Sequence, residues 1–310
     1  MGTPEFSEPS LKRLILDGYE IAAVFTQPDK PAGRGKHLHA PPVKEIAVQQ
    51  GVPVHQPSKI KSNDEVRAIF EALSPDACVV VAYGRILPAW MLAIPRLGCI
   101  NVHASLLPKY RGAAPINWAI ANGERETGVT IMQMEAGMDT GPMFIQRSIR
   151  IGEEETTPEL SARLARLGAD LLSEALPRIE RSDIAPIKQN DAEATYAPML
   201  KREDGLIDWS MSASELANRV RAFQPWPGTY TMFRGARLTI WRAHASNQGA
   251  DSSIEPGTIL TIDESGIIIA CSGSTGLAIE DIQIEGKRRV SARDFANGAR
   301  LKSGDRINQK

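Results

Sequence analysis

Two polar side chains stand near the end of an apolar segment in the middle of the chain. Asn101 and His103 alternate with the apolar residues of segment 99–102, and this pattern predicts a strand. Since residues two apart on a strand share a face, the carboxamide of Asn101 and the imidazole of His103 should lie side by side. Taken alone, the pair also fits an edge strand that faces water. A proline- and glycine-rich loop follows, however, and ligands in open α/β sheets bind beyond the carboxyl ends of strands.

A second polar group follows another apolar segment. Residues 129–134 are typical of a strand, and residues 137–142 (Gly-Met-Asp-Thr-Gly-Pro) then place Asp139 in a glycine-flanked turn. Asparagine, histidine and aspartate at one rim can supply an oxyanion donor, an acid–base group and its electrostatic partner. We therefore predict that Asn101, His103 and Asp139 are catalytic.

These motifs, in this order, resemble those of the folate-dependent formyltransferases. The strongest matches are residues 101–115 (Asn-Val-His-Ala-Ser-Leu-Leu-Pro-Lys-Tyr-Arg-Gly-Ala-Ala-Pro) and residues 137–141. The resemblance covers nearly the whole chain, with further motifs at residues 2–6, 25–36, 79–84, 207–209 and 221–227. Within this family, the chain is most similar to the branch that formylates an aminoacylated initiator tRNA.

The resemblance implies the chemistry. The donor would be 10-formyltetrahydrofolate, and the acceptor the α-amine of methionine on initiator tRNA, in translation initiation. Asn101 would donate an N–H to the oxygen that becomes negative when the amine attacks the formyl carbon. His103 would be the second donor and the acid. Asp139 would favour the imidazolium by its opposite charge and help, through water, to remove the proton of the amine.

The resemblance also implies where the folate lies. Four residues of the loop after the strand are expected against it: Ser105, Leu106, Leu107 and Pro108. Arg111 either anchors this loop or faces a substrate, and the sequence leaves both roles open. No metal is expected, because the histidines and acidic residues lack the spacing of metal ligands.

Two basic segments are candidate tRNA contacts. The polar stretch 26–42 carries Lys30, Arg34 and Lys36, and the matching loop of the tRNA-dependent relatives enters the acceptor stem. Its Gly-Arg-Gly-Lys run is not a nucleotide-binding motif, because no serine or threonine follows the lysine and no helix obviously begins there. Near the C-terminus, the candidates are Lys287, Arg288 and Arg289. Both segments could instead be ordinary charged surface that faces water. If they bind tRNA, their lysines and arginines would contact its phosphates.

Strand and helix patterns alternate through the first half of the chain, which predicts an α/β domain with a mostly parallel, Rossmann-like sheet. Residues 157–179 should form a long amphipathic helix that closes this domain. Five short strand-like runs after residue 229 predict a small barrel, and the resemblance implies that it is OB-like. The expected organisation is a catalytic domain at 1–180, a linker at 181–201 and an OB-like tRNA-binding domain at 202–310.

The beginning of the chain differs from the family pattern. Family members open with a short hydrophobic strand before Gly-Thr-Pro-Glu-Phe, whereas Met1 directly precedes Gly2 here. The first strand is therefore predicted to be missing, which should expose apolar faces and unpaired backbone edges. A misassigned or truncated start is the favoured explanation, and the intact mass of the native product would decide it.

The length, charge and cysteine content of the chain limit its fold and function further. A length of 310 residues favours two domains, and a formal net charge of −1 gives no global sign of nucleic-acid binding. Cys78, Cys99 and Cys271 show no metal spacing, and the first two lie in apolar runs typical of core positions. No apolar run approaches the length of a membrane span. We expect a cytoplasmic monomer of bacterial type.

Three alternatives stay open. Sugar-nucleotide formyltransferases share a similar His-x-Ser-Leu-Leu-Pro-Lys-Tyr-Arg-Gly run, and the hydrolase domain of formyltetrahydrofolate dehydrogenase shares the Asn, His and Asp. The basic loop, the turn at 137–141 and the C-terminal motifs argue against both. A tRNA-binding module without activity is a third possibility, and the presence of all three polar groups argues against it.

Overall fold

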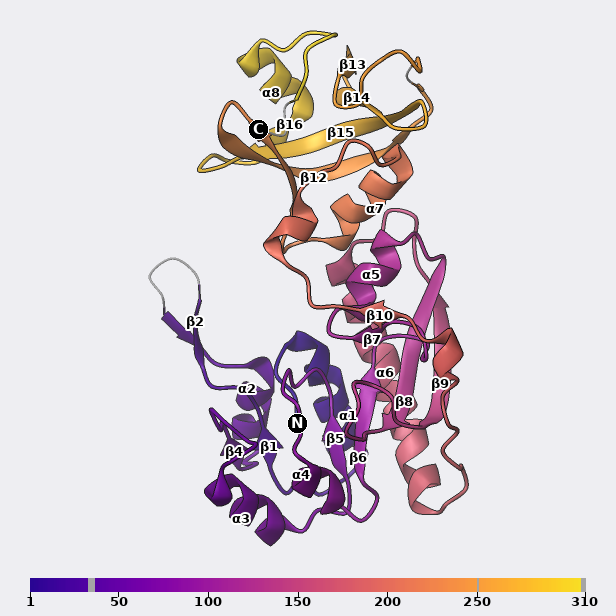
Figure 1. Cartoon of the computed structure of the whole chain (residues 1–310). Coiled ribbons are helices and arrows are strands. Elements are labelled where there is room, and N and C mark those ends of the chain that lie inside the picture. Colours follow the sequence, from indigo (N-terminus) through magenta and orange to yellow (C-terminus); the bar gives the residue numbers. More distant parts are fainter. Residues whose placement is uncertain (33–36, 250, 308–310) are drawn as a thin grey trace. The chain divides into compact units, whose positions relative to one another are not determined.

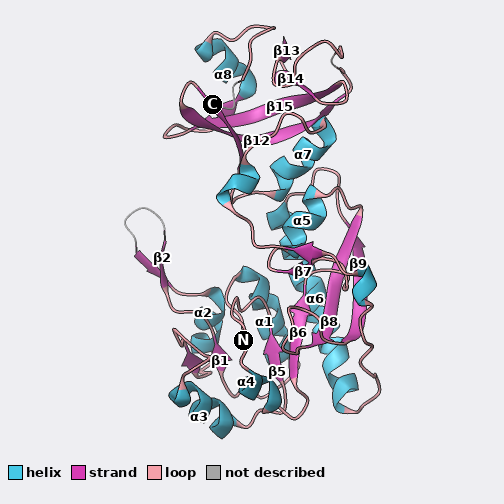
Figure 2. Ribbon diagram, in the orientation of Figure 1, coloured by secondary structure: helices cyan, strands magenta, loops and turns pink. Residues whose placement is uncertain are grey.

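The computed structural model describes residues 1–32, 37–249 and 251–307. Figure 1 follows the chain through its elements, and Figure 2 separates helices from strands. The chain divides into two compact units. The first comprises Met1–Pro115, Glu126–Arg150 and Ser161–Pro198, and the second comprises Ile116–Arg125, Ile151–Leu160 and Met199–Lys310.

The first unit contains most of the helices. They are η1 (Glu5–Ser7), α1 (Glu8–Leu16), α2 (Pro42–Gln49), α3 (Asp64–Leu73), α4 (Ala89–Ala93), the greater part of α6 (Thr157–Glu180) and η2 (Asp191–Glu193). Its strands are β1 (Val24–Phe25), β2 (Lys30–Ala32), β3 (His37–His39), β4 (Val54–His55), β5 (Cys78–Val80), β6 (Cys99–His103), β7 (Arg111–Gly112), β8 (Glu126–Gln133), β9 (Met143–Arg150) and β10 (Tyr196–Ala197).

The main sheet of the first unit has the strand order β5-β6-β8-β9 (Figure 2). β5 and β6 are parallel, whereas β6, β8 and β9 are antiparallel to their neighbours. β1 and β4 form a separate parallel pair. The prediction of a mostly parallel sheet is thus wrong for the β8–β9 half. The physical reason is that β8 and β9 are joined by a loop without a crossover helix, and such a connection leaves consecutive strands antiparallel.

Helix α6 has one buried apolar face, as predicted for an amphipathic helix. Leu164, Leu171 and Leu172 on this face are fully enclosed. The three cysteines are free and buried, which confirms that Cys78 and Cys99 are core residues. Among the helices within the described ranges, none combines the length and the apolar character that a membrane crossing requires.

Close contact between α6 and β6 depends on a glycine. A Cβ placed on Gly168 would lie 2.7 Å from Cγ1 of Val102, the residue between Asn101 and His103. Valine is branched at Cβ and has little freedom to move away. The helix therefore lies directly against the strand that carries two of the predicted catalytic residues.

Gly168→Ala is expected to destabilise the first unit by about 1–3 kcal/mol, because the added methyl group overpacks the interface with Val102. Thermal unfolding of the variant tests this. Gly298→Ala in helix α8 (Ala292–Ala299) is the matched control, because a Cβ there meets nothing within 4 Å. It should be neutral or stabilising, since alanine favours helix over glycine by up to about 1 kcal/mol. Equal effects of the two changes would contradict the packing explanation.

Helix α3 begins at Asp64, where the side chain of Asn63 accepts a hydrogen bond from Val66 N–H at 3.1 Å. Two predicted segments differ from the structure. The stretch 26–42, predicted as a loop, contains the antiparallel pair β2–β3. The predicted linker includes β10, which pairs with β7 inside the first unit.

The second unit contains α5 (Pro115–Ala121, whose first residue lies in the first unit), η3 (Arg202–Gly205), α7 (Ala213–Ala222) and α8. Its strands are β11 (Thr229–Phe233), β12 (Ala236–Ser246), β13 (Ile259–Ile262), β14 (Ile267–Cys271), β15 (Thr275–Ile284) and β16 (Val290–Ser291). The five predicted runs correspond to β11 to β15. Ser212 caps α7 by accepting a hydrogen bond from Glu215 N–H.

The strands of this unit form one antiparallel sheet in the order β11-β12-β15-β14-β13, with β16 on β15. Helix α7 packs against β12 and β15, and a core of isoleucines and leucines lies between the elements. Within the described strands, no pairing closes β11 onto β13. The OB-like barrel predicted for this unit is therefore not confirmed, and the supported description is a separate sheet domain.

Candidate active site

Strand β6 presents Asn101 and His103 to the same carboxylate. Asn101 Nδ2 lies 3.5 Å from Asp139 Oδ1, and His103 Nδ1 lies 3.7 Å from Asp139 Oδ2. Both residues of the strand are buried, while Asp139 keeps 18% of its side chain exposed. The structure thus brings together the three residues predicted to be catalytic, and the carboxylate can be reached from solvent.

A backbone carbonyl fixes the tautomer of His103. Its Nε2 lies 3.0 Å from the carbonyl oxygen of Tyr110. A carbonyl can only accept, so Nε2 must carry a hydrogen and donate it. Nδ1 is therefore the nitrogen that can gain or lose a proton, and it faces Asp139.

A tight turn holds Asp139. The residue has a left-handed backbone, with φ of 53°, which aspartate tolerates better than most residues. Its Oδ2 accepts a hydrogen bond from Gly112 N–H at 2.9 Å. Gly112 itself has φ of 126°, and a Cβ there would lie 2.5 Å from the carbonyl oxygen of Ala197. Glycine is therefore required at 112 for this N–H to reach the carboxylate.

Arg111 and Gln189 hold the turn around Asp139 through hydrogen bonds. Gln189 Nε2 donates to the carbonyl oxygens of Asp139 and Gly141, both at 2.7 Å. Its Oε1 accepts from Arg111 Nε at 3.0 Å and from Nη2 at 2.8 Å. Arg111 also pairs with Asp191 at 2.8 Å. Since both Arg111 and Gln189 are buried, Arg111 acts as an anchor of the loop.

Polar contacts also fix the loop after β6. Ser105 is fully buried and donates its hydroxyl to the carbonyl oxygen of Lys109 at 2.6 Å. Thr130 donates to the Ser105 carbonyl at 2.7 Å and accepts from Leu107 N–H at 3.2 Å. Gln146 donates to the carbonyl oxygen of Leu107 at 2.7 Å. The Ser105–Pro108 segment is therefore rigidly placed beside the three predicted catalytic residues.

Tyr83 lies at the carboxyl end of β5, close to the beginning of the chain. Its carbonyl oxygen accepts from Thr3 Oγ1 at 3.2 Å and from Gln27 Nε2 at 3.0 Å. Burial raises the pKa of its phenol to about 12, so the hydroxyl stays neutral at physiological pH. This ring belongs to the core and not to the acid–base chemistry of the site.

The structure describes only some of the residues predicted to contact tRNA. Lys30 is exposed on β2 and donates to Gln27 Oε1 at 2.7 Å, whereas Arg34 and Lys36 lie outside the described residues. Asp29, the acid of this segment, pairs with Lys44 at 2.7 Å. Hydrogen bonds from Gln56 and Lys44 lower the pKa of its carboxyl, so it is ionised at neutral pH.

In the second unit, Lys287, Arg288 and Arg289 are exposed in the turn between β15 and β16. Arg289 pairs with Asp281 at 2.7 Å and lies over the ring of Trp241 at 5.6 Å. Trp241 was not singled out from the sequence. An aromatic ring beside clustered cations is a common feature of surfaces that bind single-stranded nucleic acid.

Throughout residues 1–32, 37–249 and 251–307, no group of three or more His, Cys, Asp or Glu side chains is arranged to hold a metal ion.

Comparison with protein-family models now identifies the fold. The formyl transferase model matches residues 1–176, and the formyl transferase C-terminal domain model matches residues 199–300. The chain belongs to the formyl transferase family. The methionyl-tRNA formyltransferase of Geobacter metallireducens is 51% identical over 307 residues, covering 99% of this chain and 97% of that protein. The methionyl-tRNA formyltransferase of Koribacter versatilis is 51% identical over 306 residues, covering 99% of this chain and 96% of that protein.

Solved structures share the fold of this chain. WlaRD, a sugar 3N-formyl transferase solved with dTDP and 5-N-formyl-THF, has a TM-score of 0.66 at 16% identity and covers 93% of this chain and 97% of that chain. HypX from Aquifex aeolicus, in complex with tetrahydrofolic acid, has a TM-score of 0.58 at 18% identity. The match covers 83% of this chain and 44% of that chain. Both structures were solved with a folate, and this chain shares their fold.

Proposed function

We propose that this chain transfers the formyl group of 10-formyltetrahydrofolate to the α-amine of methionyl-initiator-tRNA, giving N-formylmethionyl-tRNA for translation initiation. The observation that carries the proposal is the 51% identity over 307 residues to a methionyl-tRNA formyltransferase, since it spans both units. The geometry around Asp139 agrees with it, because an amide, an imidazole and a carboxylate meet at one partly open point.

Asn101 is the first oxyanion donor in this proposal. Its Nδ2 carries two hydrogens, and only one can point at Asp139 Oδ1, 3.5 Å away. The second is left to donate to the formyl oxygen as the attacking amine makes that oxygen negative. A fixed donor of this kind is worth more in a buried site than in water, because it is already oriented.

His103 and Asp139 handle the protons. With Nε2–H held by the Tyr110 carbonyl, His103 in its imidazolium form presents Nδ1–H as the second donor. Asp139 stabilises that charge from 3.7 Å. The exposed part of its carboxylate can take the proton of the attacking amine through a water. The rigid Gly112 contact keeps the carboxylate in place while this occurs.

The loop Ser105–Pro108 is proposed to bind the folate. The Ser105 hydroxyl is used inside the loop, so its contribution is to shape the backbone. Leu107 is buried, which leaves Leu106 and Pro108, both partly exposed, as the candidates to cover an apolar ring. When bound, the folate supplies the activated formyl group, and this segment orients it beside Asn101.

The two domains predicted from the sequence, and the segment between them, have proposed roles. We assign catalysis to a Rossmann-like domain at 1–180, a connection to 181–201 and tRNA binding to an OB-like domain at 202–310. The described cations Lys30, Lys287, Arg288 and Arg289, together with Arg34 and Lys36, would contact phosphates. Initiator tRNA and a folate are the proposed partners, and the enzyme is proposed to act as a cytoplasmic monomer.

Lys287→Ala and Arg288→Ala test the tRNA surface. Each should weaken binding of initiator tRNA, and each should reduce the slope of log affinity against log salt by about 1, as expected for one lost phosphate contact. Filter binding over a salt series measures both quantities. Lys12→Ala, which removes an exposed lysine paired with Glu8 on α1, is the control. Unchanged salt slopes in both Lys287→Ala and Arg288→Ala would show that this turn does not contact the tRNA.

The acceptor itself tests the proposed function. With 10-formyltetrahydrofolate as donor, kcat/KM should be orders of magnitude higher for methionyl-initiator-tRNA than for methionine ethyl ester, because the tRNA adds binding energy away from the reacting amine. Since sugar-nucleotide formyltransferases are the alternative left open by the sequence, a 4-amino-sugar nucleotide is the second acceptor to offer. Preference for the sugar would replace the proposal with that activity.

A further inference from the structure

Strands β2 and β3 form a hairpin that extends outward from the first unit, next to α2 (Figure 1). The side chains of Lys30, Pro31, Leu38 and His39 on this hairpin are exposed. An isolated two-stranded hairpin is marginally stable at best in water. The direction of the hairpin must therefore be fixed where it joins the rest of the first unit.

An ion pair closes the base of the hairpin. Asp29 immediately precedes β2, and Lys44 lies in the first turn of α2, which follows β3. Lys44 Nζ lies 2.9 Å from Asp29 Oδ1 and 2.7 Å from Oδ2. Only 27% of the lysine side chain and 29% of the aspartate side chain are exposed, so the attraction is stronger than between fully solvated charges. The segment that enters the hairpin is thus joined to the segment that leaves it.

Gln56 ties this ion pair to the strands of the first unit. It directly follows β4, which pairs with β1. Its Nε2 donates to Asp29 Oδ1 at 2.7 Å and to the carbonyl oxygen of Gln27 at 2.9 Å. An amide nitrogen carries two hydrogens, so one side chain can make both bonds. The residue at the base of the hairpin is therefore fixed to the carboxyl ends of β1 and β4.

Gln27 extends the network to the main sheet. Its Nε2 donates to the Tyr83 carbonyl at 3.0 Å, and its Oε1 accepts from Lys30 Nζ at 2.7 Å. Tyr83 follows β5, and β5 is parallel to β6. Since the carboxyl ends of parallel strands lie at one edge of a sheet, the hairpin begins at the edge that carries Asn101 and His103.

The charge of Asp29 fits an anchoring role. It is the single acid of the otherwise basic segment 26–42, and an unpaired carboxylate there would repel phosphates. Both of its oxygens instead accept hydrogen bonds, from Lys44 and Gln56. A carboxylate can bind a lysine and an amide at once through two acceptor oxygens, whereas asparagine would offer one.

We propose that Asp29, Lys44 and Gln56 are positioning residues for the tRNA acceptor. Together they set the direction of the β2–β3 hairpin, and thereby the place where the cations of segment 30–36 meet the phosphates. The identity of the RNA rests on the proposed function, whereas the anchoring of the hairpin does not. These residues act through the hairpin and are assigned no contact with the formyl group.

Asp29→Asn tests the role in the reaction. The change should lower kcat/KM for methionyl-initiator-tRNA by at least about tenfold, because displacement of a substrate-positioning element can cost up to about 10²-fold. The KM for 10-formyltetrahydrofolate should stay at the parental value, since the bonds of the Ser105–Pro108 loop are untouched. Steady-state kinetics with each substrate varied in turn separates the two. A role in stability alone would not affect one substrate and spare the other.

The partner lysine supplies the rescue and the coupling. Lys44→Met should cause the same loss as Asp29→Asn, and Lys44→Arg, which keeps the charge, should restore most of the activity with tRNA. The double variant should lose no more than either single variant, because all three break one interaction. Asp76→Asn, which breaks an exposed ion pair with Arg96, is the matched control and should keep parental kinetics. Additive losses at positions 29 and 44 would overturn the paired role.

The direction of the hairpin can be measured without activity. Nitroxide labels on Leu38→Cys in β3 and Ala68→Cys in α3 would occupy exposed positions of the first unit. The three native cysteines are buried, which directs the label to the new thiols. Double electron–electron resonance should show one narrow distance distribution in the labelled parent and with Asp76→Asn, and a wider or shifted distribution with Asp29→Asn or Lys44→Met.

The two measurements separate the anchoring from the proposed function. An unchanged distance distribution in folded Asp29→Asn and Lys44→Met would overturn the anchoring. A changed distribution with parental tRNA kinetics would overturn the positioning role. If the parent chain formylates no tRNA, the proposed function fails, and the distance distributions still decide whether Asp29 and Lys44 anchor the hairpin.

Discussion

Replacing His103 with alanine is expected to slow formyl transfer by at least about 10²–10³-fold, the usual cost of removing one oxyanion donor. The imidazole is buried, its Nε2 is held by the Tyr110 carbonyl, and its Nδ1 faces Asp139 at 3.7 Å. No other side chain of that trio can supply a positive charge at this point. Single-turnover rates with saturating donor and acceptor measure the loss in the chemical step.

The same loss is expected for Asn101→Ala and for Asp139→Asn. The latter keeps an oxygen that can accept from Gly112 N–H, so the turn should survive while the charge is lost. Asn297→Ala, an exposed asparagine of α8, is the matched control and should keep the full rate. Circular dichroism and thermal unfolding would verify that each variant is folded. Near-normal turnover of folded His103→Ala would rule out the proposed mechanism.

Replacing Arg111 with methionine is the second large effect that we expect. The change removes the donors to Gln189 Oε1 and leaves this buried oxygen without its cation. An unsatisfied buried polar group costs about 1–3 kcal/mol, and thermal unfolding should show that loss. Activity should also fall, by up to about 10²-fold, because Gln189 then holds the backbone of Asp139 less firmly.

A double variant separates positioning from stability. Arg111→Met with Gln189→Met also removes the unpaired Gln189 oxygen, but the carbonyls of Asp139 and Gly141 lose their donor, so stability should return only in part. Activity should stay low, because Gln189 no longer holds the turn. Arg67→Met, which breaks an exposed ion pair with Glu71, should change stability by less than about 1 kcal/mol. Recovery of both stability and activity in the double variant would limit the pair to a structural role.

The three candidate catalytic residues could be located from the sequence because local rules place them. Asn101 and His103 share a face through the two-residue period of a strand, and glycines mark the turn around Asp139. Their meeting in space confirms that spatial prediction, while their chemical roles stay predictions. The folate and tRNA contacts rest on the resemblance, and Arg34 and Lys36 lie outside the described residues.

Gln189 could not be located in the same way. It lies in a segment with few periodic apolar positions, which reads as a linker, and it reaches Asp139 only through tertiary structure. Gln146 and Thr130 sit on antiparallel strands whose pairing depends on the order of the sheet. Arg111 was the one clue to Gln189 in the sequence, since an arginine that is buried needs a polar partner.

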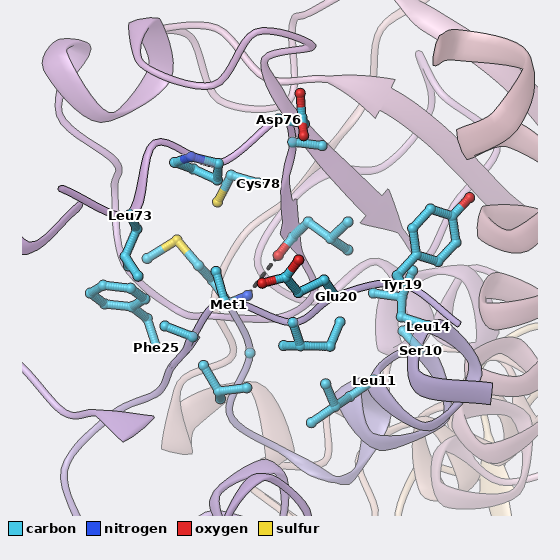
Figure 3. A pocket seen from close by; sticks show the side chains of 18 of the residues that line it. Met1, Ser10, Leu11, Leu14, Tyr19, Glu20, Phe25, Leu73, Asp76 and Cys78 are labelled. Carbon is cyan, nitrogen blue, oxygen red and sulfur yellow. Dashed lines mark hydrogen bonds between the residues drawn. The ribbon is translucent and has the colours of Figure 1, made fainter. Parts of the chain in front are cut away.

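The beginning of the chain shows a limit of sequence reasoning. The sequence predicts exposed apolar faces there, whereas Leu14 and Phe25, which line a pocket with Met1 (Figure 3), are buried. The sequence did not show that Met1 and Gly2 make backbone hydrogen bonds to β5 and β1. Those bonds depend on residues far along the chain, such as Val79 and Phe25, and become visible only in three dimensions.

The fate of a labelled formyl group is the most direct test of the proposed activity. The folded chain would be supplied with 10-[¹⁴C]formyltetrahydrofolate, methionyl-initiator-tRNA and a 4-amino-sugar nucleotide together. We predict that the label appears on the α-amine of methionine, and that it appears at least about 10²–10³-fold more slowly when Asn101 or His103 is alanine. Label on the sugar, or release as free formate, would contradict the proposed transfer to methionyl-tRNA.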